Sequence, residues 1–309
     1  MNKKLVKKLA LLLTMGLTMG MAVGCSGSDA SEKEGSEITI GSKTFTENIV
    51  LGKILVKYLD NQGYNVVDET GLGETGIIRQ AITSGEIDGC FEYTGTGLMQ
   101  FMKHDPVFNS DECYKLIRDF DKKNGIVWLD YAQANNTYAL AMPKEIAEKY
   151  NLKNASDLAK AYNDGKHIKF VTAAESYERP DMMPRLFSVY GFNIDQKDRL
   201  MLDLGLFYDA LKNGEGEVTT GFMTDGRIKS DNLVVLDDDK SAFAVYNIAP
   251  VFRQETIDEY PELPETVKKL TDLLDTKTVT ELNYKVDVDG QEIDDVVDTF
   301  LSENGLVKQ

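Results

Sequence analysis

The chain has 309 residues, with 34 Lys and Arg against 51 Asp and Glu, a formal net charge of −17 at pH 7 and 42% hydrophobic residues. This hydrophobic fraction is enough for a large core, which excludes a disordered chain. The acidic balance argues against DNA or RNA as a partner, because nucleic-acid binding needs a basic surface. No apolar run of about 18 residues occurs beyond residue 24, so the body has no predicted membrane-spanning segment.

The first 24 residues are a predicted signal peptide. Four lysines between residues 3 and 8 precede the apolar stretch Leu9–Val23. Ala22–Cys25 resembles a bacterial lipobox, which implies cleavage before Cys25 and lipidation of its thiol. An ordinary secretory leader cut nearby is the alternative. With the lipid, residues 25–36 are an anchor and flexible tether, and the protein is exported and held at the outer face of the cytoplasmic membrane.

The body contains two cysteines and two histidines whose roles the sequence leaves open or excludes. Cys90 and Cys113 could form a disulfide in an exported protein or could be two buried thiols. His104 and His167 do not have the spacing of zinc ligands, so we expect no metal and no cofactor.

In the first part of the body, strands and helices are expected to alternate. Strands are predicted at 37–42, 64–69 and 89–93, and helices from a capping box at 44–47 through residue 59, at 76–84 and at 94–101. This spacing is typical of βαβ units around a parallel sheet.

A second cycle of elements follows from residue 138. Strands are predicted at 138–142, 167–172 and 233–236, and helices at 144–150, 155–163, 181–190, 207–213 and 294–302, with 284–288 running into a turn signal at Asp289–Gly290. Two α/β lobes therefore fit the sequence better than one.

The segment Gly71–Gly76 matches the glycine pattern of a dinucleotide-binding loop. Glu74 would place a negative charge inside that loop, which opposes a pyrophosphate. A glycine-rich turn that packs near another ligand is therefore the preferred interpretation. Motifs for a serine nucleophile, a zinc protease and a phosphate loop are absent from the sequence, so we do not predict an enzyme. An exported hydrolase and a surface adhesin stay as alternatives.

Basic and aromatic residues lie at the predicted strand ends. Lys43 and Thr96 are in strand-to-helix turns, where free backbone amides and the helix dipole favour an anion, and Tyr93 lies beside one of these turns. The alternative is that Tyr93 belongs to the core and Lys43 is solvated.

Several segments together resemble the substrate-binding proteins of glycine betaine/carnitine/choline ABC transporters. They keep their order along nearly the whole body and comprise Ile40–Asn48, Ser84–Asp88 with Glu92–Thr96, Asn135–Leu140, Tyr177–Asp181, Thr224–Ile228 and Glu281–Asp287. The resemblance implies a two-lobed clamp of the periplasmic-binding-protein type (type II-like), each lobe a mostly parallel sheet with flanking helices. The first lobe would comprise residues 37–137 and 245–309, and the second lobe residues 138–244.

The resemblance also implies a binding site between the lobes. An aromatic cage for a quaternary ammonium would be formed by Tyr93, Tyr138, Phe222 and Tyr246, and a carboxylate would be held by Lys43, Thr96 and Arg179. Asn48 would be a second-line contact. Phe222 departs from the family pattern, which commonly has Tyr there, and Ala244–Tyr246 departs from the usual aromatic-Pro-Pro-Tyr.

The implied function is capture of glycine betaine, carnitine, choline or a similar compatible solute and its delivery to an ABC permease. Another trimethylammonium ligand, such as ergothioneine, is the alternative within the same fold. The expected partners are this ligand, the permease and, through Cys25, the membrane. The protein is expected to be a monomer without catalytic residues.

Overall fold

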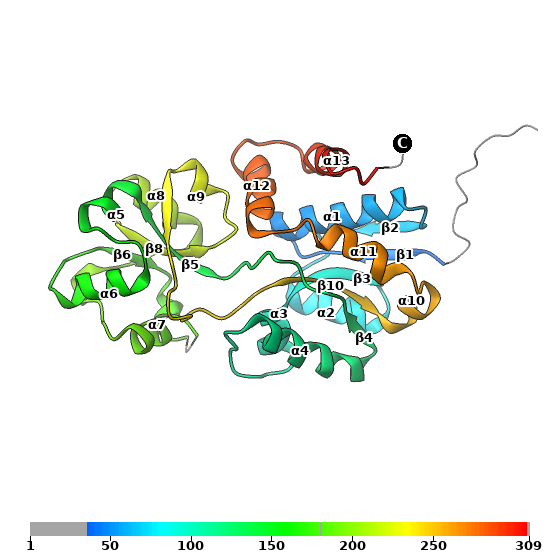
Figure 1. Cartoon of the computed structure of the whole chain (residues 1–309), viewed down its shortest axis with the longest axis horizontal. Coiled ribbons are helices and arrows are strands. Elements are labelled where there is room, and N and C mark those ends of the chain that lie inside the picture. The colour runs from blue at the N-terminus through cyan, green and yellow to red at the C-terminus, as the bar shows by residue number, and fades with distance from the viewer. Residues whose placement is uncertain (1–35, 180, 308–309) are drawn as a thin grey trace, which may run out of the picture. The chain divides into compact units, whose positions relative to one another are not determined.

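The computed structural model describes residues 36–179 and 181–307. The strands of these residues form two five-stranded sheets (Figure 1). The first sheet has the order β2-β1-β3-β10-β4 and the second β7-β6-β8-β5-β9. In each sheet four strands share one direction, and β10 or β5 runs against them. The strands are β1 Ile38–Gly41, β2 Val66–Glu69, β3 Gly89–Tyr93, β4 Ile126–Trp128, β5 Tyr138–Pro143, β6 Phe170–Thr172, β7 Arg199–Met201, β8 Val218–Phe222, β9 Leu233–Leu236 and β10 Ile248–Arg253.

We call each sheet with its helices a lobe. The first lobe holds α1 Thr46–Asn61, α2 Thr75–Ser84, α3 Thr94–Thr96, α4 Ser110–Asp121, α10 Gln254–Glu259, α11 Leu263–Thr271, α12 Thr276–Asp287 and α13 Ile293–Glu303, and the second α5 Lys144–Tyr150, α6 Ala155–Asn163, α7 Met183–Tyr190, α8 Phe207–Lys212 and α9 Arg227–Ser230. The predicted architecture of two mostly parallel sheets with flanking helices is confirmed.

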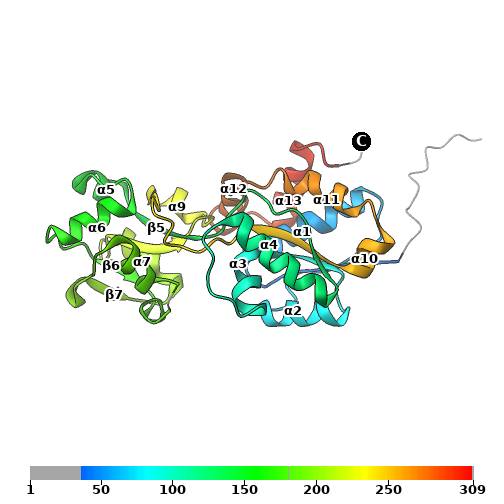
Figure 2. The same ribbon diagram turned by 60° about the horizontal axis from the view of Figure 1, so that its bottom comes forward.

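Helices cover both faces of the first sheet. α1 buries Leu51, Ile54, Leu55 and Tyr58, a spacing that places them on one side of the helix, and they join a core with α11, α12 and α13. On the opposite face, α2 and α4 pack against β4 in a separate core that includes Trp128 (Figure 2). β3 is buried along its whole length because it lies between β1 and β10.

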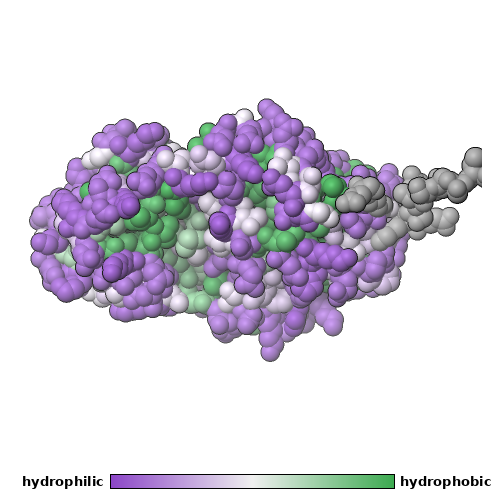
Figure 3. Space-filling view, turned by 45° about the horizontal axis from the view of Figure 1, so that its top comes forward, coloured by the Kyte–Doolittle hydropathy of each residue, from purple (hydrophilic) through white to green (hydrophobic). Residues whose placement is uncertain are grey.

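The second lobe repeats this plan with shorter elements. α5, α6 and α7 pack on one face of its sheet around Phe170, and α8 covers the other face through Phe207 and Leu211. Hydrophilic residues cover most of the face shown in Figure 3, with apolar residues gathering over this lobe at the left. Among the described helices, none is both long and apolar enough to cross a membrane.

Two neighbouring chain segments connect the lobes. Residues 129–137 lead from β4 to β5, and residues 237–247 return from β9 to β10. They are joined by the Asn136 N–H, which donates to the Tyr246 carbonyl at 3.1 Å, and the Tyr246 N–H, which donates to Asn135 Oδ1 at 2.8 Å. These bonds hold the two segments together where a relative movement of the lobes would bend the chain.

The structure corrects one prediction of local structure and completes another. The capping box at the start of α1 is wrong, because Thr44 Oγ1 donates to Glu74 in the glycine-rich loop and Phe45 occupies the N-cap position. Residues 284–288 mostly complete α12, so the turn signal marks the end of a helix, with Gly290 at φ 68°. Cys90 and Cys113 are both buried free thiols. The signal peptide, Cys25 and nearly all of the tether lie outside the described residues.

Candidate functional site: an aromatic pocket between the lobes

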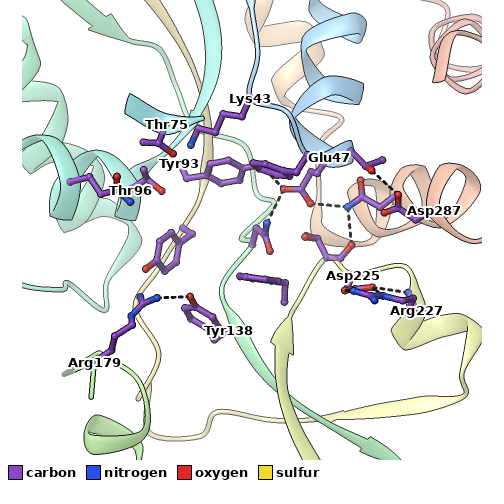
Figure 4. Close-up of a pocket in the computed structure, with 18 residues that line it drawn as sticks. Lys43, Glu47, Thr75, Tyr93, Thr96, Tyr138, Arg179, Asp225, Arg227 and Asp287 are labelled. Carbon is purple, nitrogen blue, oxygen red and sulfur yellow. Dashed lines mark hydrogen bonds and ion pairs between the residues drawn. The ribbon is translucent and has the colours of Figure 1, made fainter. Parts of the chain in front are cut away.

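A cavity of about 520 Å³ lies between the two lobes (Figure 4). This volume is typical of pockets that bind small molecules. All seven residues predicted to bind a ligand line it. The complete lining is Lys43, Phe45, Thr46, Glu47, Thr75, Tyr93, Thr96, Gln100, Asn136, Tyr138, Arg179, Phe222, Thr224, Asp225, Arg227, Tyr246, Asn283 and Asp287.

Strand ends bring the aromatic side chains to this cavity. Tyr93 is the last residue of β3, Tyr138 the first of β5 and Phe222 the last of β8. Tyr138 and Phe222 are opposite one another in the β5–β8 pair, with ring centroids 5.1 Å apart. Tyr246, from the returning segment, meets the Tyr138 ring edge-on at 6.1 Å. The three rings Tyr138, Phe222 and Tyr246 thus form a continuous apolar wall.

The first lobe contributes the facing aromatic residues. The ring of Tyr93 is 6.1 Å from that of Phe45, which the sequence analysis did not single out. Phe45 is 41% exposed although it is a large apolar residue, because it forms part of the pocket wall rather than the core. Its position in the turn after β1, next to Lys43, was the signal available in the sequence.

Lys43 reaches the pocket as half of a buried ion pair. Its Nζ lies 2.5 Å from Glu92 Oε1, and both side chains are less than 5% exposed. The same Nζ is 5.0 Å from the centroid of the Tyr93 ring. Glu92 therefore already neutralises the positive charge of Lys43, which was predicted to bind a ligand carboxylate.

Arg179 is also paired within the protein. Its Nε and Nη2 donate to the two carboxylate oxygens of Asp181 at 3.2 and 2.6 Å, and its Nη1 donates to the Tyr138 hydroxyl at 3.2 Å. The hydrogen bonds that Arg179 donates to Asp181 raise the pKa of Arg179, which stays charged. The guanidinium thus fixes the hydroxyl of a pocket ring and presents its remaining Nη1 edge to the cavity.

Thr75 and Thr96 line the pocket from helix starts. Thr75 is the first residue of α2, directly after the glycine-rich loop, and Thr96 lies in α3. The loop is attached to the end of β1, since the Gly71 N–H donates to Ser42 Oγ at 2.8 Å and the Leu72 N–H donates to the Ser42 carbonyl. The glycine-rich turn therefore packs beside the pocket.

Asn48, the expected second-line contact, does not line the cavity. Its Oδ1 accepts the Lys43 N–H at 2.6 Å, and its Nδ2 donates to the Phe91 carbonyl at 3.2 Å. It thereby holds the turn that carries Lys43 against β3.

Glu47 is the pocket residue that the sequence analysis missed most clearly. Its carboxylate is 5% exposed and accepts hydrogen bonds from Tyr93 Oη at 2.7 Å, Asn136 Nδ2 at 2.9 Å and Asn283 Nδ2 at 2.8 Å. Burial raises the pKa of Glu47, and these bonds together with Thr224 act in the opposite direction. Its place in the first turn of α1 favours the ionised form.

The remaining charged lining residues form a polar end of the cavity. Arg227 donates from Nη2 to Asp225 at 2.7 Å, and Asp287 accepts a hydrogen bond from Thr46 at 2.7 Å. Asn283 donates both to Glu47 and to the Thr224 carbonyl, which connects α12 with the loop after β8. Figure 4 shows this end opposite Lys43 and Thr96.

A small histidine-acid cluster lies outside this pocket. His167 Nδ1 is 2.9 Å from Asp198, and Asp195 is the third member. The ammonium of Lys197 lies 3.1 Å from His167 Nε2, so a positive charge already occupies the neighbourhood that a metal ion would need. The residues present therefore do not suit a cation.

The fold and the pocket together define a substrate-binding component of a transporter. The family described as the substrate-binding domain of the ABC-type glycine betaine transport system matches residues 36–303, and the chain belongs to this family. Substrate-binding proteins of ABC importers act outside the cytoplasm, and the family is not a class of enzymes.

Particular relatives cover nearly the whole chain. A glycine-betaine-binding protein of Pseudomonas aeruginosa is 36% identical over 92% of this chain and 93% of its own. The glycine betaine-binding protein YehZ of Escherichia coli is 33% identical over 88% and 92%. The solved apo structure of YehZ superposes with a TM-score of 0.79 at 32% identity, covering 88% of this chain and 100% of that one. A solved glycine betaine/carnitine/choline ABC transporter protein gives 0.80 at 29% identity, with 88% and 98% covered.

Proposed function

We propose that this protein captures a quaternary-ammonium compatible solute, such as glycine betaine, carnitine or choline, and delivers it to the permease of an ABC importer. The observation that carries the proposal is the set of four rings from both lobes, Tyr93, Tyr138, Phe222 and Tyr246, around one cavity. A trimethylammonium group has no N–H, so hydrogen bonds cannot select it. Ring faces can, at about 0.5–2 kcal/mol each.

The second part of the proposal concerns the ligand carboxylate. Thr96 and the Nη1 edge of Arg179 are its proposed partners, with Lys43 supplying a nearby positive end of an ion pair. Asp181 already occupies the fork of Arg179, so a carboxylate would meet one edge of the guanidinium rather than both of its nitrogens. We therefore expect the carboxylate to add less affinity than the cage.

Closure of the lobes follows from this arrangement. The proposed lobe boundaries are residues 37–137 with 245–309, and 138–244. Because each lobe supplies rings to the same ligand, the ligand binds best when the lobes approach, and a permease can distinguish the loaded protein from the empty one.

The proposal includes a lipid anchor at Cys25, after a signal peptide of residues 1–24, with residues 25–36 as the tether and the monomer as the working form. Mass spectrometry of the N-terminal peptide of the mature protein tests the anchor: Cys25 is expected to be the first residue and to carry the lipid on its thiol. A different N-terminus, or an unmodified Cys25 thiol, would contradict lipidation at this residue.

Ergothioneine is a second candidate ligand because of the polar end of the cavity. Asp225, Arg227 and Asn283 offer acceptors and donors beyond the ring wall, which suit a ligand that has further polar groups besides a trimethylammonium and a carboxylate.

Thermal unfolding in the presence of glycine betaine, carnitine, choline, proline betaine and ergothioneine tests the proposed function. A ligand at 100 times its Kd adds about 2.7 kcal/mol to the free energy of unfolding and raises the melting temperature. NMR of the recovered ligand should show it unchanged. The absence of a shift with every compound would contradict the proposal, and conversion of a compound would favour the hydrolase alternative.

A further inference from the structure

The pocket has an excess of negative charge once the partners of its lining cations are counted, because Glu92 and Asp181 lie behind Lys43 and Arg179. Each lining cation has a carboxylate partner: Lys43 pairs with Glu92, Arg179 with Asp181 and Arg227 with Asp225. Among the described residues, Glu47 and Asp287 have no ion-pair partner within 4.0 Å. Asp287 is exposed at the end of α12, whereas Glu47 is 5% exposed.

The hydrogen-bond partners of Glu47 are polar but neutral, and they come from different parts of the fold. Tyr93 donates from β3, Asn136 from the segment that connects the lobes and Asn283 from α12. Hydrogen bonds of this kind satisfy the oxygens but do not cancel the charge. A carboxylate removed from water without a cation is unfavourable, and it gains most when a positive charge enters beside it.

The position of Glu47 places it where such a charge would enter. Its side chain lines the cavity, and the hydroxyl of the cage residue Tyr93 rests on its Oε1 (Figure 4). We propose that Glu47 is the counter-charge of the ligand's quaternary ammonium and makes the site select ligands by charge, beyond what the ring faces do. This inference rests on the proposed function, and it deepens it by adding a specificity-determining residue.

A purely structural role for Glu47 is the competing explanation. In that case the carboxylate would only hold Tyr93 and Asn136 in place, and its loss would weaken every ligand that fills the cage. A counter-charge acts on the ligand's charge, so its loss weakens a cation and spares an uncharged ligand of the same shape. The two roles therefore predict different values for one ratio, the affinity for the cation divided by the affinity for the uncharged ligand, after Glu47 is replaced.

The experiment compares choline with 3,3-dimethylbutan-1-ol, in which carbon replaces the ammonium nitrogen, by calorimetry on the full chain in detergent. Wild-type protein is expected to prefer choline strongly. Glu47→Gln should lower the affinity for choline by about 10- to 100-fold, because it removes an ion pair in a partly screened site. It should change the affinity for the neutral compound little. Equal losses for both compounds would overturn the inference.

Tyr93→Phe is the matched control variant, because it removes one donor to Glu47 and keeps the ring. It should retain the preference for choline over the neutral compound. If Tyr93→Phe abolishes this preference as Glu47→Gln does, the network rather than the charge sets it, and the inference is wrong. If wild-type protein binds neither choline nor glycine betaine, the proposed function fails together with it.

Proton release gives a readout that does not depend on a folded variant. Burial raises the pKa of Glu47 above its ordinary value, and a cation that binds beside the carboxylate favours the ionised form, so binding displaces a proton at any pH where Glu47 is partly protonated in the free protein. The ionisable or charged groups nearest to Glu47 on the packed elements are Tyr93, Lys43 with Glu92 beyond it, Asp225, Arg227 and Asp287.

Choline binding is therefore expected to weaken as the pH falls through the pKa of Glu47 and to release protons in that range, measured in two buffers of different ionisation enthalpy. Binding of 3,3-dimethylbutan-1-ol should release none, because it leaves the charge of the pocket unchanged. Proton release that is absent with choline, or equal for both compounds, would overturn the inference even if Glu47→Gln does not fold.

Discussion

In the first lobe, Lys43 and Glu92 form an ion pair between side chains that are less than 5% exposed, whereas in the second lobe Arg179 and Arg227 are more than one third exposed and each pairs with an aspartate two residues away. The Lys43–Glu92 pair joins two segments that are far apart in the sequence, and both side chains are buried in the lobe. The second-lobe pairs lie within single short segments. Each of the three pairs lies within one lobe, so a relative movement of the lobes would separate none of them, but only the first-lobe pair is closed off from solvent.

The largest expected effect is at the buried pair. Lys43→Ala leaves Glu92 buried without its cation and should lower the free energy of unfolding by about 3–5 kcal/mol, as measured by urea denaturation. Lys53→Ala is the matched control, because Lys53 pairs with Asp68 on the surface of the same lobe and should cost less than about 1 kcal/mol. Equal losses of unfolding free energy in the two variants would show that the buried pair contributes no more to stability than the surface pair.

A pocket ring from the second lobe should affect binding more than folding. Tyr138→Ala removes the ring that contacts Phe222 and Tyr246 and should weaken quaternary-ammonium binding by about 10- to 100-fold in a calorimetric titration. Tyr150→Ala, at the end of α5 and outside the pocket, should leave the affinity unchanged. Unaltered affinity in Tyr138→Ala would remove the second lobe from the cage.

Arg179 separates ligands with a carboxylate from choline, which has none. Arg179→Ala should lower the affinity for glycine betaine by about 10-fold and the affinity for choline by less, because only glycine betaine loses a charge-assisted hydrogen bond. Arg227→Ala, at the polar end of the cavity, should not distinguish these two ligands. The same loss for both ligands in Arg179→Ala would indicate that this residue acts only by holding the Tyr138 hydroxyl.

The smallest effect is expected at the surface contact between the lobes. Lys229 on α9 lies 2.6 Å from Glu281 on α12, with both side chains about half exposed. Lys229→Ala should leave the free energy of unfolding nearly unchanged, and any change should shrink further in high salt. A large, salt-independent loss would mean that the lobes depend on this contact.

Local patterns in the sequence predict most of the elements. The bounds of α5, α6 and β9 agree with those expected, because hydrophobic periodicity and turn residues act over a few positions. The same local patterns predicted the turn at Asp289–Gly290 but not that the segment before it is the helix α12. A turn signal at Asp289–Gly290 does not say whether a strand or a helix precedes it.

The pocket could be predicted only through the resemblance. Of the matched segments, Ile40–Asn48 supplies four lining residues, Thr224–Ile228 three and Glu281–Asp287 two. What could not be predicted is how these segments interact across the chain. The bond between Asn283 and Glu47 joins residues 236 positions apart, and no local pattern shows that Glu47 lies buried among neutral donors.

The most direct test of the central claim is a calorimetric titration of the wild-type chain and Tyr138→Ala with glycine betaine, carnitine, choline, proline betaine and ergothioneine. The proposed cage predicts binding of at least one compound with a Kd on the order of micromolar, about −8 kcal/mol, and a clear loss in the variant. No binding of any compound, or equal binding by both proteins, would contradict the proposal that this pocket holds a quaternary ammonium.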